Sequence, residues 1–114
     1  MSRHIVSDAE GMVRELRDRG LRLADVAKAT GTTERTVSNW GRGRPAAGPN
    51  EDRLRELSYL ADQLAETLDR QGPGQWLRSP NRLLDGRRPL DVLADGGYDR
   101  VLNAVHAYLE GTYV

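Results

Sequence analysis

Cysteine is absent from this 114-residue sequence, which excludes disulfide bonds and thiolate metal sites. Its absence also fits a reducing cytoplasm, where disulfides are rare. No apolar run approaches the roughly 20 residues that a transmembrane helix needs. Residues 1–6 lack the apolar stretch of a signal peptide. Together these absences predict a cytoplasmic protein without a membrane segment.

An excess of charge of either sign is also missing, because 17 basic residues balance 17 acidic ones. Any contact with nucleic acid must therefore depend on local charge. Residues 1–49 contain 9 basic and 6 acidic residues, a balance of +3, whereas residues 50–114 contain 8 and 11, a balance of −3. This asymmetry suits a basic half that faces DNA and an acidic half that faces a partner, but ordinary scatter explains it equally well.

A pattern typical of β-strands is missing as well, since no segment sustains an alternation of apolar and polar residues. Helix signals are dense instead. Ser7 and Glu10 form a capping box that predicts a helix to about residue 19. Two short helices are predicted at about 23–29 and 33–40. The sequence thus predicts an all-α fold.

The longest predicted helix covers about residues 51–71, where leucines recur at steps of three and four. Asn50 is expected to cap this helix, and Gly72-Pro73-Gly74 is expected to stop it. Residues 44–49 are rich in proline and glycine and are the best candidate for a linker. Further short helices are expected around Trp76 and at about 80–84, 89–95 and 98–110.

Residues 23–40 meet the spacing demands of a helix-turn-helix. Ala27 is small where the two helices would cross, and Gly31 tolerates positive φ at the turn four residues later. Val37 and Trp40 are apolar anchors at the expected steps in the second helix. Because four independent demands are met, a helix-turn-helix is predicted here.

The run over residues 31–43 resembles the recognition helix of the Xre/Cro-like repressor families. The resemblance implies that side chains pointing away from Val37 and Trp40 contact operator DNA. Arg35 is suited to guanine and Asn39 to adenine. The expected base contacts are Glu34, Arg35, Ser38 and Asn39, and the expected phosphate contacts are Thr33, Thr36, Arg42 and Arg44.

The same polar side chains would also suit an ordinary solvated helix surface. The local surplus of three positive charges comes from Lys28, Arg35, Arg42 and Arg44 against Glu34. This modest surplus predicts weak, salt-sensitive binding by one copy, so a homodimer or a larger hetero-oligomer is expected. Thr32 stands where the repressor pattern usually has an apolar residue, which leaves open a helix-turn-helix that no longer binds DNA.

A second set of motifs occupies residues 72–114. It runs in the order Trp76-Leu77, Pro80-Asn81, Gly86, Pro89-Leu90 and then a helix closed by Gly111. This order resembles the toxin-binding domain of the Xre/MbcA/ParS antitoxins. The predicted organisation is a helix-turn-helix domain at 1–49, a connecting or dimerisation helix at 50–71 and a toxin-binding domain at 72–114.

The resemblance implies that the chain neutralises a RES-domain toxin that degrades NAD⁺. Antitoxins of this family cover the entrance of the toxin's active site with their C-terminal segment. The tail here is short, so its docking costs little ordering entropy, and Tyr113 is a suitable anchor. Without the resemblance, the favoured interpretation would be a frayed tail that has no function. The expected toxin-binding residues are Trp76, Arg87, Arg88, Gly111, Thr112, Tyr113 and Val114.

Alternative readings of some of these residues remain open. Trp76 among short helices is more typical of a core residue, and Arg87 and Arg88 also suit a solvent-exposed surface. His4 and His106 stand alone, so no metal site or cofactor is expected, and no catalytic motif is present. The chain is therefore predicted not to be an enzyme.

The leading prediction is an antitoxin that also represses its own operon through residues 23–44. One alternative is a plain transcriptional repressor whose C-terminal helices only dimerise, with the leucine stripe of residues 51–71 as the contact. Another is a toxin-binding protein that has lost DNA binding.

Overall fold

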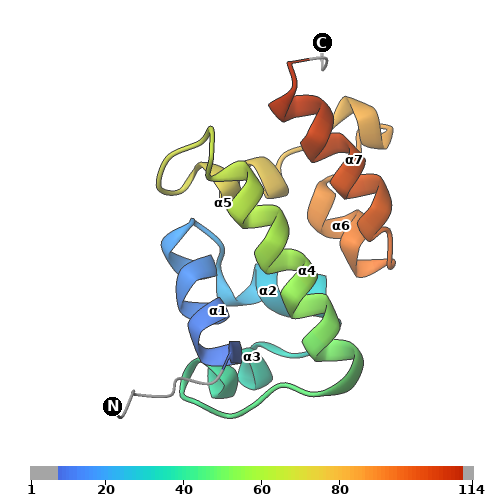
Figure 1. Cartoon of the computed structure of the whole chain (residues 1–114). Coiled ribbons are helices and arrows are strands. Elements are labelled where there is room, and N and C mark those ends of the chain that lie inside the picture. Colours follow the sequence, from blue (N-terminus) through green and yellow to red (C-terminus); the bar gives the residue numbers. More distant parts are fainter. Residues whose placement is uncertain (1–7, 112–114) are drawn as a thin grey trace.

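The computed structural model describes residues 8–111, and over that range the chain is all-helical (Figure 1). The predicted fold class is therefore confirmed. The helices are α1 (Asp8–Asp18), α2 (Leu23–Thr30), α3 (Glu34–Gly41), α4 (Gly48–Leu64), α5 (Gly72–Arg78), the 3₁₀ helix η1 (Arg82–Leu84), α6 (Pro89–Ala94) and α7 (Tyr98–Leu109). No helix of the described range is long and apolar enough to cross a membrane.

Helix α4 forms the centre of the molecule because its leucine stripe is buried along its whole length. Leu54, Leu57, Leu60 and Leu64 are each at most 1% exposed. Burying a leucine side chain contributes roughly 2 kcal/mol, so the stripe is a main source of stability. Helices α1, α2, α5 and α7 all pack against α4.

Helix α2 connects the two halves of the chain. It packs against α3 on one side and against α6 on another, and the buried residues of both halves form one continuous core. Lys28 of α2 pairs with Asp91 of α6 at 2.6 Å. Asp25 of α2 pairs with Arg78 of α5 at 2.7 Å. The predicted division into segments at residues 49 and 71 stays a prediction.

The start of α4 differs from the prediction. The helix begins at Gly48, with Ala47 at the N-cap position and Pro49 in the first turn, so Asn50 is not the cap. The side-chain amide of Asn50 instead donates a hydrogen bond to the backbone carbonyl of Thr30 at 2.9 Å. Asn50, which was predicted to cap α4, therefore provides a hydrogen-bond donor for a backbone carbonyl at the C-terminal end of α2.

The end of α4 also differs, because the helix stops at Leu64 and not near residue 71. The chain turns back so that Gly72-Pro73-Gly74 opens α5, although this run was predicted only to stop a helix. The backbone N–H of Gly74 donates to the carbonyl of Arg19 at 2.9 Å. A Cβ atom on Gly74 would lie 2.2 Å from the carbonyl oxygen of Gly20, so this contact requires glycine. Tertiary contact thus overrides the helical pattern.

The C-terminal helices largely follow the sequence signals. Asn81 caps η1, since its side chain accepts a hydrogen bond from the backbone N–H of Leu83 at 2.9 Å. Pro89 lies in the first turn of α6, as predicted. The predicted capping box of the first helix includes Ser7, which lies outside the described residues.

Candidate functional site

Helix α3 is anchored by apolar side chains and presents a polar surface. Val37 and Trp40 are buried, and α3 packs against α1 and α2. Gly31 adopts φ 76°, the left-handed conformation expected at the turn. The hydroxyl of Thr33 accepts a hydrogen bond from the backbone N–H of Thr36 at 3.1 Å and caps α3. This geometry suits a helix-turn-helix, whose role in DNA binding stays a prediction.

The predicted base-reading side chains lie away from these anchors. Glu34 and Arg35 are exposed, whereas Ser38 and Asn39 are half-buried. Within residues 8–111, Arg35 has no ion-pair partner. Of the four predicted base-reading side chains, Glu34 and Arg35 are therefore the more accessible for contact.

The predicted phosphate contacts divide into two kinds. The hydroxyls of Thr33 and Thr36 bond to each other at 3.0 Å, so both serve the first turn of α3. Arg42 and Arg44 are exposed and, in the described part of the chain, pair with no carboxylate. They line a shallow hollow together with Asn39. The two arginines are therefore better suited to phosphates than the two threonines.

Two basic residues of α1 were missed by the sequence reasoning. Arg14 and Arg17 line, with Arg42, a hollow of about 250 Å³ between α1 and α3. Arg14 pairs with Glu10 at 2.9 Å, whereas Arg17 is exposed and has no ion pair among the described residues. Their spacing of three residues places them on one face of a helix, which was the available signal.

Lys28 does not contribute free charge to this surface. Its ammonium group bonds to the carboxylate of Asp91 at 2.6 Å and holds the pKa of Asp91 below its ordinary value. The predicted surplus of positive charge around α3 is therefore supplied by arginines alone, with Arg17 in the place of Lys28.

The predicted toxin-binding side chains before the tail have different surroundings. Trp76 is half-buried, with its ring centre 5.8 Å from that of Tyr108. Arg87 is exposed and pairs with Asp95 at 2.7 Å. Arg88 is exposed beside it, and no carboxylate within residues 8–111 pairs with it. Trp76 thus has a packing role, while Arg88 is free to meet a partner.

The predicted anchor segment follows α7. Gly111 is exposed and adopts φ 73°, which lets the chain change direction after the helix. Thr112, Tyr113 and Val114 lie outside the described residues.

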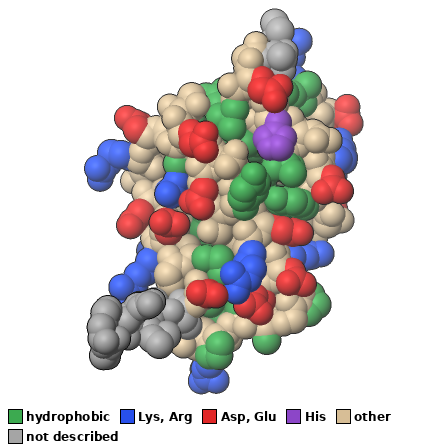
Figure 2. Space-filling model, viewed as in Figure 1, with side chains coloured by type: hydrophobic (Ala, Val, Ile, Leu, Met, Phe, Trp, Pro, Cys, Tyr) green, Lys and Arg blue, Asp and Glu red, His purple; other side chains and the backbone are tan. Residues whose placement is uncertain are grey.

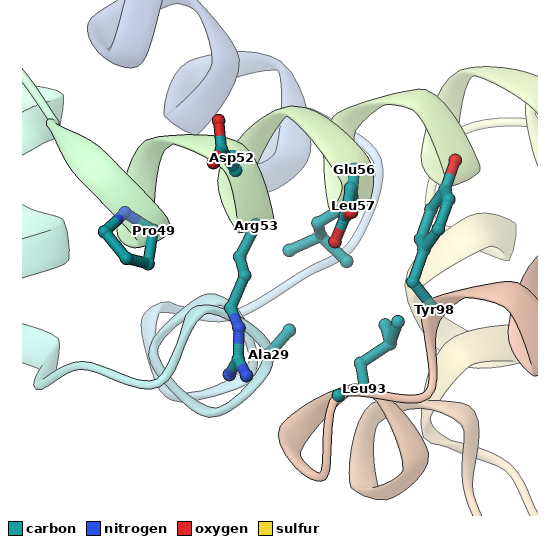
Figure 3. Close-up of a pocket in the computed structure, with 9 residues that line it drawn as sticks. Ala29, Pro49, Asp52, Arg53, Glu56, Leu57, Leu93 and Tyr98 are labelled. Atoms are coloured by element: carbon teal, nitrogen blue, oxygen red, sulfur yellow. The ribbon is translucent and has the colours of Figure 1, made fainter.

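A cleft of about 290 Å³ opens between the first half of α4 and the turn from α6 to α7 (Figure 3). Leu57 and Leu93 form apolar walls, and Glu56 and Tyr98 also line the cleft. Burial is the main cause that raises the pKa of the Glu56 carboxyl above its ordinary value. Burial first, and then the charge of Glu56, raises the pKa of Tyr98. The sequence reasoning did not single out this cleft.

Arg53 also lines the cleft, but its side chain extends away from Glu56 toward the end of α2 (Figure 3). A Cβ atom on Gly31 would lie 3.0 Å from Nη1 of Arg53, and one on Gly96 would lie 3.8 Å from Nη2. The guanidinium is therefore close to the C-terminal ends of α2 and α6. Positive charge is favourable there because the helix dipole is negative at that end.

Hydrophobic side chains are exposed where α4 and α7 meet, with acidic side chains around them (Figure 2). Tyr59 is 45% exposed, and Tyr98 and Leu102 are half-buried. We call Glu56, Tyr59, Tyr98 and Leu102, together with the cleft, the α4–α7 face. Across residues 8–111, no group of three His, Cys, Asp or Glu side chains could hold a metal ion.

Comparison with known proteins gives consistent matches along the chain. The model of the antitoxin Xre/MbcA/ParS C-terminal toxin-binding domain matches residues 62–111. The mycobacterial cidal antitoxin MbcA of Mycobacterium tuberculosis is 39% identical over 111 residues, which cover 96% of each chain. A probable mycobacterial cidal antitoxin of the same species is 38% identical over 109 residues, covering 94% of this chain and 92% of the relative.

A solved structure is similar over the same range. The crystal structure of the M. tuberculosis MbcT–MbcA toxin–antitoxin complex contains a chain that is 38% identical to this one. The match has a TM-score of 0.80 and covers 96% of this chain and 100% of that chain. The similarity therefore includes the helices on both sides of α4.

Proposed function

The chain belongs to the Xre/MbcA/ParS family of antitoxins, and on that premise we propose that it neutralises a RES-domain toxin that degrades NAD⁺. It is an antitoxin of a toxin–antitoxin system, as its relatives are. Its C-terminal segment covers the entrance of the toxin's active site, so neutralisation needs no catalysis by the antitoxin. The toxin, and not a cofactor, is its ligand.

The observation that carries this proposal is the likeness to a chain solved in complex with a toxin, MbcT. Helices α5 to α7 lie entirely within the matched toxin-binding segment. They are held in place by buried side chains such as Leu77, Leu90 and Val101. A surface supported in this way binds with little reorganisation, which favours affinity. Arg88 and Gly111 are exposed on it.

Neutralisation by the C-terminal segment is tested by co-expression with a RES-domain toxin. The full chain should restore growth, and a chain that ends at Glu110 should fail while still folding. The shortened chain should still fold, because it retains every buried core residue of the described range, the last of which is Val105. Full rescue by the shortened chain would show that the tail is not the blocking element.

We also propose that the antitoxin binds operator DNA through α3 and represses its own operon, with two copies on one site. The exposed arginines of α3 and α1 that have no carboxylate partner in the described range support this role. Arg35→Ala should reduce the preference for operator over unrelated DNA, because it removes a base contact. Arg17→Ala should weaken binding to operator DNA and to unrelated DNA alike. It should also lower the slope of log affinity against log salt concentration by about one.

Mobility-shift titrations at several salt concentrations measure both effects. Arg82→Ala is the matched control, since Arg82 is exposed in η1 at the other end of the chain. Unchanged affinity and salt slope in the Arg17 and Arg35 variants would favour an antitoxin that does not use α3 to bind DNA.

A further inference from the structure

Glu56 is a half-buried carboxylate, and the charge of Arg53 only partly offsets its burial, since the pKa of Glu56 stays above its ordinary value. In the described part of the chain this carboxylate makes no hydrogen bond and no ion pair. The nearby guanidinium of Arg53 is turned toward Gly31 and Gly96 (Figure 3). Removing a carboxylate from water without pairing it is unfavourable, as the raised pKa of Glu56 reflects. A second group that completes this site would therefore gain from binding there.

The chemistry of the α4–α7 face defines that group. Asp52 lines the cleft together with Glu56 and Arg53. The charge of Arg53 lowers the pKa of Glu56, whereas the charges of Asp52 and Asp99 raise it. Tyr59 is one of the groups that raise the pKa of Tyr98, and the two side chains add aromatic surface to this face. Aromatic rings beside carboxylates favour a cationic side chain, above all the planar guanidinium of arginine.

Charge also excludes two other occupants. DNA is repelled by an acidic face. A second copy that met this face through a two-fold axis would bring two faces with the same acidic side chains together, and like charges across an interface are unfavourable. The partner that fits is a different protein with a basic side chain.

We propose that the α4–α7 face binds an arginine side chain of the toxin, with its guanidinium on Glu56 and its stem against Tyr98. This proposal rests on the proposed function, because it takes the toxin as the partner. It adds a contact on α4, since Glu56 lies outside residues 62–111, the segment that matches the toxin-binding domain. The toxin-contacting surface therefore extends onto the central helix.

The test measures the affinity of the full antitoxin for the RES-domain toxin that it neutralises, by calorimetry at low and high salt. Glu56→Gln keeps the shape of the side chain and removes its charge. Glu15→Gln is the matched control, because Glu15 is exposed on α1, outside the matched segment. We expect Glu56→Gln to weaken binding about 10-fold or more and to reduce the salt dependence, with Glu15→Gln within about 2-fold of the parent.

The outcomes separate the two proposals. If the parent binds and Glu56→Gln binds equally well at both salt concentrations, the arginine site is wrong and the proposed function stands. If the parent itself does not bind the toxin, both fail. If Glu56→Gln instead changes the sedimentation of the antitoxin alone, the face joins copies of this chain and the proposal is overturned.

Discussion

Gly74→Ala should destabilise the protein strongly, although it adds only one methyl group. The new Cβ would lie 2.2 Å from the carbonyl oxygen and 2.3 Å from the carbonyl carbon of Gly20, whereas ordinary contact begins at 3.4 Å. Both atoms are backbone, so no side chain can rotate away. The start of α5 must therefore move by about 1 Å, which strains the packing by ~1–3 kcal/mol. The hydrogen bond from Gly74 to Arg19 is lost or lengthened, at about 1 kcal/mol.

The sum is about 3 kcal/mol, which in a domain of this size lowers the Tm by roughly 10 °C. Thermal and urea unfolding followed by circular dichroism measure it. Gly11→Ala is the control, because Gly11 lies inside α1 with nothing within 4 Å of its added Cβ. That substitution should stabilise the protein by ~0.5–1 kcal/mol. A Gly74→Ala protein as stable as the parent would refute the account of how α5 docks on the α1–α2 turn.

Two further substitutions test the electrostatics. Arg78→Met should lower the free energy of unfolding by about 2–3 kcal/mol in urea titrations, because it leaves the mostly buried carboxylate of Asp25 without its 2.7 Å partner; a loss below about 0.5 kcal/mol would contradict this. Burial holds the folded-state pKa of Glu56 above its ordinary value of 4.5, so ionisation of Glu56 reduces stability as the pH rises from 4.5 through the folded-state pKa. Glu56→Gln should therefore raise the Tm at pH 7, and a gain that does not shrink below pH 4.5 would show that burial is not the cause.

Local patterns in the sequence predicted the helices well where the signal comes from residues of the same helix. The leucines of α4 recur with helical spacing, and their burial follows directly. The predictions were wrong where a residue serves another element. Asn50 bonds to Thr30, twenty residues away, and Gly74 meets Gly20 across the α1–α2 turn. No local pattern carries such contacts, because they depend on how the helices are arranged.

The same limit applies to the candidate sites. The polar side of α3 could be predicted, since Val37 and Trp40 fix which side is buried. The participation of Arg17 could not, because it depends on α1 packing beside α3. Glu56 looks in the sequence like any charged residue of a solvated helix. Only the approach of α6 and α7 to α4 makes it half-buried.

The arrangement of charge has a consequence for how the two proposed partners share one chain. Unpaired arginines lie on α1 and α3, and the acidic α4–α7 face lies on the other side of α2, which packs against both α3 and α6. The ion pairs of Asp25 and Lys28 link α2 to α5 and α6, while packing joins α2 to α3, so α2 contacts both halves of the chain. We therefore expect DNA and toxin to occupy one copy together. Any effect of one on the affinity for the other must then be transmitted through α2 or α4, because both helices pack against elements of the two halves.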